Sequence, residues 1–193
     1  MIRSLRLVFV LLMISGIAFS QGQDNSLKGV PIKERIVTGG GLGLGFGSNQ
    51  DFISISPVIG YSITKKLIAG TGLTYRYTNY KIYRPSIRLT DYAVNPFARY
   101  MVYKGFFVQS EYEYLNYELP YLNGSAVETT RRGFDSFMAG GGLIQPLGRN
   151  LAFYVMALYN FSYSSNPNAN VYSPYTSPIV FRAGINIGRF FGI

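Results

Sequence analysis

The chain has 193 residues and a formal net charge of +9, with 16% aromatic but only 14% charged residues. That charged fraction is low for a soluble globular domain, in which about a quarter of the residues are charged. The absence of His excludes a Ser–His–acid catalytic triad, and the absence of Cys excludes disulfides and thiolate metal sites. Beyond residue 20 no apolar run reaches the ~20 residues of a membrane-spanning helix. These features are typical of a membrane β-barrel, which spreads its apolar surface over alternate residues of many strands.

The N-terminus has the pattern of a cleavable signal peptide over residues 1–20. Arg3 and Arg6 form a short basic region, an apolar stretch follows, and Ala18 and Ser20 supply the small residues that signal peptidase requires. The alternative, a membrane anchor, is less favoured because the apolar stretch is short and ends in small residues. Cleavage would leave 16 basic against 9 acidic residues, a net charge of +7. For an exported chain this charge favours contact with anionic lipid headgroups over nucleic acid.

Residues 21–35 are polar, and we expect a flexible periplasmic segment there. The first strand is predicted over residues 36–47, where five glycines fall on one parity and Leu and Phe side chains on the other. This glycine run invites a phosphate-loop interpretation, but no Lys-Ser/Thr follows it and no frame fits G-x-G-x-x-G. Glycines that face a narrow barrel interior explain the run better.

Alternation of apolar and polar residues continues through seven further segments. They cover residues 52–63, 67–78, 91–102, 106–117, 133–147, 151–163 and 179–191. The pattern is clearest over residues 106–117, where one face is mainly aromatic and apolar and the other carries Gln109, Glu111 and Glu113. A period of two indicates a strand with two unlike faces. Only residues 133–147 leave the facing open, because three glycines interrupt their pattern.

The connections alternate in length along the chain. Long connections are predicted over residues 79–90, 118–132 and 164–177, and short turns follow the second, fourth and sixth strands. Short periplasmic turns and longer outer loops are the pattern of outer-membrane barrels, and an even strand number brings both ends of the barrel to the periplasmic side. We therefore predict an all-β fold over residues 36–193, an eight-stranded antiparallel transmembrane β-barrel with up-and-down meander order.

The C-terminal strand contains Gly184, Ile185 and Ile187 followed by Phe190 and Phe191. With the strand count, the connection pattern and the signal peptide, it resembles the small eight-stranded outer-membrane barrels of the OmpA/OmpX type. The chain departs from that pattern in the two residues that follow the aromatic pair. The resemblance implies residence in the outer membrane, contact with its lipids and lipopolysaccharide, and insertion by the barrel-assembly machinery. It does not imply an activity, since this architecture hosts many functions.

Five charged residues lie mid-strand on the parity opposite the aliphatic face of their strands. They are Arg76, Arg99, Glu111, Glu113 and Arg182. An Arg or Lys facing lipid near the bilayer midplane costs ~2–4 kcal/mol, so these side chains are expected to share the lumen. A turn centred on Gly105 pairs Arg99 with Glu111 within a two-residue slip, and Arg76 could reach the same cluster.

Two carboxylates spaced i, i+2 on one face are also compatible with an acid/base pair of the kind that hydrolyses glycosides. An interior ion-pair network that plugs the barrel is favoured instead, because arginine partners keep both carboxylates ionised. Eight strands also leave an interior just wide enough for side chains.

Cationic and tyrosine side chains gather in the predicted extracellular loops. Candidate contacts there are Lys81, Tyr83, Arg84, Arg88, Arg131 and Arg132. They could bind a polyanion, a glycan or a protein, and contact with lipopolysaccharide phosphates is the simplest interpretation. We therefore expect a non-enzymatic outer-membrane protein without cofactor or metal, structural or surface-binding through its loops. The alternatives are a narrow pore or an accessory subunit of a secretion or uptake complex.

Overall fold

The structure is a computed structural model that describes residues 25–46, 50–81, 86–123, 126–164, 175 and 177–191. The predicted signal peptide, Tyr83, Arg84 and most of the predicted loop 164–177 lie outside these ranges. In the described part of the chain, no helix is long and apolar enough to cross a membrane.

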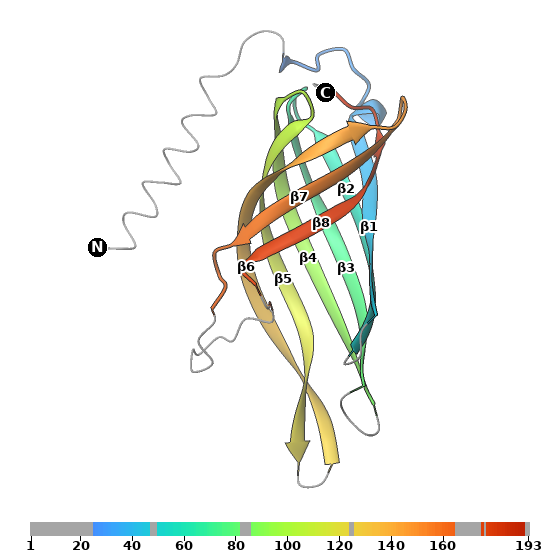
Figure 1. Ribbon diagram of the computed structural model, residues 1–193. Coiled ribbons are helices and arrows are strands. Elements are labelled where there is room, and N and C mark those ends of the chain that lie inside the picture. The colour runs from blue at the N-terminus through green and yellow to red at the C-terminus, as the bar shows by residue number, and fades with distance from the viewer. Residues whose placement is uncertain are drawn as a thin grey trace, which may run out of the picture.

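Eight antiparallel strands close into a barrel in simple sequential order, each strand pairing with the next and β8 with β1 (Figure 1). The strands are β1 Ile36–Phe46, β2 Gln50–Ser62, β3 Leu67–Tyr80, β4 Ile87–Tyr103, β5 Phe106–Asn123, β6 Ala126–Pro146, β7 Leu151–Asn160 and β8 Ile179–Gly188. A short 3₁₀ turn, η2 Ile32–Arg35, precedes β1. The predicted eight-stranded antiparallel meander is therefore confirmed.

The two faces of each strand differ as the alternation predicts. Aliphatic and aromatic side chains such as Ile53, Leu73 and Val108 are exposed on the outer wall, whereas polar side chains such as Asn95 and Gln109 are buried inside. This is the inverse of a water-soluble protein and matches a barrel whose outer wall contacts lipid.

The facing of β6, which the sequence left open, is settled by the barrel. Phe134, Ser136 and Met138 are buried inside, and Phe137 lies exposed on the outer wall. The glycines of this strand permit close backbone approach to β7. A Cβ on Gly140 would overlap the carbonyl oxygen of Ala157.

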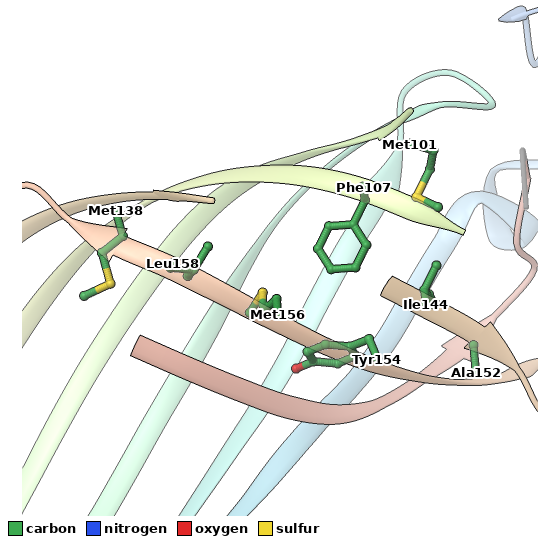
Figure 2. Close-up of a cluster of buried hydrophobic side chains, with 8 residues drawn as sticks. All are labelled: Met101, Phe107, Met138, Ile144, Ala152, Tyr154, Met156 and Leu158. Atoms are coloured by element: carbon green, nitrogen blue, oxygen red, sulfur yellow. The ribbon is translucent and has the colours of Figure 1, made fainter. Parts of the chain in front are cut away.

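The interior is filled unevenly. One apolar cluster, drawn in Figure 2, contains Met101, Phe107, Met138, Ile144, Ala152, Tyr154, Met156 and Leu158. A second contains Ala93, Leu115, Tyr117 and Phe134. Both clusters come from β4 to β7, whereas β2 and β3 present mainly small inward residues such as Ser54, Gly60 and Gly72. One half of the lumen is therefore packed, and the other is lined by small residues.

The predicted long loop 118–132 is instead largely strand, so that prediction is wrong, and strands enter the predicted loop 79–90 from both ends. β3 runs to Tyr80 and β4 begins at Ile87, while β5 and β6 stay paired up to Asn123↔Ala126. The β5–β6 hairpin projects beyond the other strands at the bottom of Figure 1. Continued pairing satisfies the backbone hydrogen-bonding groups, and charges and prolines at the edge of a ribbon do not end it.

Residues 25–35, part of the segment predicted to be flexible, make specific contacts with the short-turn end of the barrel. Arg35 donates to the carbonyl oxygens of Leu27 (2.7 Å) and Val30 (3.1 Å) and to the Tyr61 hydroxyl (3.3 Å). Leu27 is buried, and the amide of Lys65 donates to the carbonyl oxygen of Asn25 (3.0 Å).

The barrel closes through a short seam. β1 and β8 pair only from Val37↔Gly188 to Gly40↔Ile185, whereas β1 pairs with β2 along its whole length. Beyond Gly40 the two strands continue without a shared ladder. The join between the first and last strands is thus confined to the short-turn half of the barrel.

Candidate functional site in the barrel lumen

Arg182 forms ion pairs with two glutamates across the lumen. Its Nη2 atom lies 2.8 Å from Glu111 Oε1 and 3.1 Å from Glu113 Oε2. The two glutamates are two residues apart on β5, so both point inward, and each is only 3% exposed. Arg182 reaches them from β8, on another part of the barrel wall.

Neutral donors complete the binding of both carboxylates. Gln109 Nε2 donates to Glu111 Oε2 (2.9 Å), and Asn95 Nδ2 donates to Glu113 Oε2 (2.6 Å). The Tyr175 hydroxyl, from the connection between β7 and β8, donates to Glu113 Oε1. Burial, with Glu113 nearby, raises the pKa of the Tyr175 hydroxyl well above its usual value, so this tyrosine stays a donor.

Arg99 joins this cluster indirectly. The register pairs it with Gln109, two residues from Glu111, and its Nε donates to Gln109 Oε1 (2.8 Å). Its guanidinium carbon lies 4.2 Å from the ring centre of Phe107 and 5.0 Å from that of Tyr154. Aromatic faces therefore surround this buried cation, and the Gln109 amide links it to Glu111.

Arg76 also faces the lumen, but it pairs with Asp91 rather than with the glutamates. The two groups meet at 2.8 Å (Nε to Oδ2) and 2.7 Å (Nη2 to Oδ2), and Asp91 Oδ1 accepts from the amide of Glu118 (3.2 Å). Sequence reasoning missed Asp91 as a site residue. Asp91 could have been recognised because it lies on the same inward-facing side of β4 as Asn95 and Arg99.

The described cations that were predicted for the extracellular loops differ in their partners. Lys81 pairs with Asp51 (2.8 Å), and Arg131 pairs with Glu118 (3.1 Å). Arg88 and Arg132 are exposed. Half of the described candidates are thus already matched by neighbouring carboxylates.

Arg131 acts as a clamp at this end of the barrel. It donates to Asn116 Oδ1 (2.7 Å) on β5 and to Thr90 Oγ1 (2.7 Å) on β4, and it lies 5.0 Å from the Tyr92 ring centre. These contacts join the projecting hairpin to the neighbouring strand.

A cavity of about 290 Å³ lies between the charged cluster and the small-residue wall. Its lining includes Ser56, Gly72, Thr74, Asn95 and Arg182. The volume corresponds to on the order of ten water molecules. Among the residues that the structure describes, no group of His, Cys, Asp or Glu side chains could hold a metal ion.

Comparisons with known proteins give a structural likeness but no match in sequence. No family model matches the chain, and no curated protein matches it. Among solved structures, the N-terminal β-barrel domain of Pseudomonas aeruginosa OprF is similar, at 11% identity and a TM-score of 0.43, over 80% of this chain and 97% of that one. The closed ladder of the chain itself establishes an eight-stranded antiparallel β-barrel with up-and-down meander order.

Proposed function

We propose that the protein is a non-enzymatic integral barrel of the outer membrane, with a lumen closed by the Arg182–Glu111–Glu113 cluster. It serves a structural role or binds partners at the end that carries the projecting hairpin. The observation that carries this proposal is the buried ion-pair cluster inside a barrel whose outer wall is apolar.

The outer wall supports placement in a bilayer. Its exposed aliphatic side chains form a band, and aromatic side chains pack against one another toward the hairpin end. Tyr75 lies 5.4 Å from Tyr92, and Phe161 lies 5.8 Å from Phe137 and 5.1 Å from Tyr159, between ring centres. Aromatic girdles of this kind mark the membrane interface of outer-membrane barrels.

The contacts of the two carboxylates support a non-enzymatic role. Glu111 and Glu113 share one arginine, and each also accepts from a neutral donor. Here one cation serves both groups, which is the arrangement of a structural network.

A narrow pore is the second candidate, favoured by the cavity beside the cluster. Planar-bilayer recording of the purified barrel separates the two. We expect no steady conductance from the native protein, because packed side chains and the Arg182–Glu111–Glu113 cluster fill the lumen beside the cavity.

The matched variants are Thr74→Phe, which fills the cavity, and Thr71→Phe, which places the same ring on the outer wall of the same strand. A steady current that Thr74→Phe abolishes and Thr71→Phe preserves would overturn the closed-lumen proposal.

Surface contacts at the hairpin end are part of the same proposal. Arg88 and Arg132 are exposed cations suited to lipopolysaccharide phosphates, and the hairpin offers a surface for a glycan or a protein partner. Membership of a secretion or uptake complex is the alternative use of this surface. Co-purification from cross-linked membranes, with the hairpin shortened as the control, tests for a stable protein partner.

A further inference from the structure

The net positive charge of the described residues is concentrated at one end of the barrel. In the lumen, three arginines face three carboxylates: Arg76, Arg99 and Arg182 with Asp91, Glu111 and Glu113. At the hairpin end, the described residues include equal numbers of cations and carboxylates: Lys81, Arg88, Arg131 and Arg132 against Asp51, Glu118, Glu128 and Asp135. Neither the lumen nor the hairpin end therefore contributes to the net positive charge.

The short-turn end carries the imbalance. The turns contribute Lys65, Lys66, Lys104 and Arg149, and the segments before β1 and after β8 add Lys28, Lys33, Arg35 and Arg189. Glu34 is the single carboxylate among the described residues of this end. Eight cations and one carboxylate give a net charge of +7, while the other two regions are balanced.

Backbone contacts bring these turns together at one rim. The amide of Met101 donates to the carbonyl oxygen of Lys66 (2.7 Å), which links the β2–β3 turn to the end of β4. The amide of Gly188 donates to the carbonyl oxygen of Asn150 (3.0 Å), which links the end of β8 to the β6–β7 turn. The charges therefore surround one end of the barrel.

Cations at this rim lie beside aromatic side chains at the edge of the apolar wall. Lys104 Nζ is 5.1 Å from the ring centre of Tyr103, which is 62% exposed, and Arg189 lies 5.3 Å from the ring centre of Phe191. Aromatic rings lie at headgroup depth in membrane proteins, and flexible cations extend from there to the phosphates.

We propose that the short-turn rim binds anionic phospholipid headgroups of the leaflet that surrounds it, with Lys66 and Lys104 as central contacts. The inference rests on the proposed placement in a bilayer. Phospholipid is favoured over a soluble acidic partner because the cations flank lipid-facing rings. The described residues of the end predicted to face lipopolysaccharide are electrically balanced, so selectivity for anionic lipid belongs to the opposite end.

The absence of Trp from the chain makes a site-specific lipid reporter simple to build. Tyr103→Trp, the rim reporter, places a single indole at the short-turn rim, and Tyr159→Trp, the girdle reporter, places one in the opposite girdle. Each protein is folded into phosphatidylcholine vesicles that contain brominated phosphatidylglycerol or, separately, brominated phosphatidylcholine. Quenching of the indole fluorescence then shows which lipid occupies each position.

The rim reporter is expected to be quenched with a roughly threefold preference for phosphatidylglycerol at low salt, since each interfacial cation attracts anionic lipid. The preference should fall toward unity at high salt, where screening shortens the reach of the charges. The girdle reporter should show no preference at either salt concentration.

Adding Lys66→Gln and Lys104→Asn to the rim reporter should abolish its preference. Asn suits position 104 because Lys104 has φ of 41°, a conformation that Asn tolerates. The control, Arg88→Gln with Arg132→Gln, removes two charges at the other end and should leave the preference unchanged. Circular dichroism checks folding, and if the variant without the two lysines does not fold, the salt titration of the rim reporter decides alone.

Equal quenching of the rim reporter by both brominated lipids would overturn the inference while leaving the bilayer placement intact. Binding of the rim to sedimented peptidoglycan without any lipid preference would also overturn it. If neither lipid quenches either reporter, the barrel is not in the bilayer, and it is the proposed function that fails.

Discussion

Replacing Arg182 with Met removes the cation that Glu111 and Glu113 share while keeping an unbranched side chain of similar length. Both carboxylates stay buried at 3% exposure, and the ion pairs of 2.8 and 3.1 Å are lost. The nearest other cation of the cluster, Arg99, reaches Glu111 only through the Gln109 amide. The substitution therefore leaves two negative charges close together without a direct counter-ion.

Removing one partner of a buried ion pair costs about 3–5 kcal/mol of unfolding free energy. The neutral donors Asn95 and Gln109 remain, and the cavity lies beside the cluster, so we expect the lower end of that range, about 3 kcal/mol. Arg189→Met is the matched control, because its pair with Glu34 is exposed. An exposed pair is worth about 0–1 kcal/mol.

Reversible urea unfolding of the vesicle-inserted barrel, followed by far-ultraviolet circular dichroism, measures both losses. Adding Glu111→Gln and Glu113→Gln to Arg182→Met should recover part of the stability, because both uncompensated carboxylates are removed while Arg99 keeps its contacts with Phe107 and Tyr154. The reasoning is refuted if Arg182→Met costs no more than Arg189→Met. It is equally refuted if the triple variant is less stable than the single one.

Two further predictions concern the barrel wall. Gly140→Ala should destabilise the barrel by about 1–3 kcal/mol in urea unfolding, because the new Cβ would overlap a carbonyl oxygen of β7, whereas Gly72→Ala, whose nearest contact is 3.5 Å, should cost less than ~0.5 kcal/mol. Equal losses would contradict this account of the glycines. Arg131→Met should speed amide hydrogen exchange in the projecting part of the β5–β6 hairpin without altering β7, because it removes the contacts to Thr90 and Glu118. Unchanged exchange there would show that the clamp is dispensable.

Alternation alone predicted the strand count, the order and the inward facing of the charged cluster. It succeeded because shifting a strand by one residue would turn all of its inward charged side chains toward lipid. The alternation of apolar and polar residues is therefore strongly constrained. Over residues 118–132 it failed, because apolar residues such as Leu119 and Leu122 fall on both parities among polar ones. The period of two is then no longer visible, although the backbone pairing continues.

Partner choice inside the lumen was beyond the sequence. Arg76 was assigned to the glutamates, yet it pairs with Asp91. Arg99 lies within the predicted two-residue slip of Glu111, but it reaches that carboxylate only through Gln109. Parity gives the face of a strand but not the height of a side chain in the barrel, which depends on register and strand tilt. A two-residue difference in register keeps the facing and changes the partner.

The seam between β1 and β8 has a kinetic consequence. The β5–β6 ladder has eighteen residue pairs joined by a local hairpin, whereas the β1–β8 ladder has four pairs between opposite ends of the barrel sequence. Thr38 and Ile187, which meet there, are 149 residues apart. Closing so long a loop for so few hydrogen bonds makes the seam the last contact to form during folding and the first to open. Folding is therefore expected to begin at the β5–β6 hairpin and to add strands on either side of it. The β1–β8 pairing that closes the barrel forms last and joins the two strands at one end only.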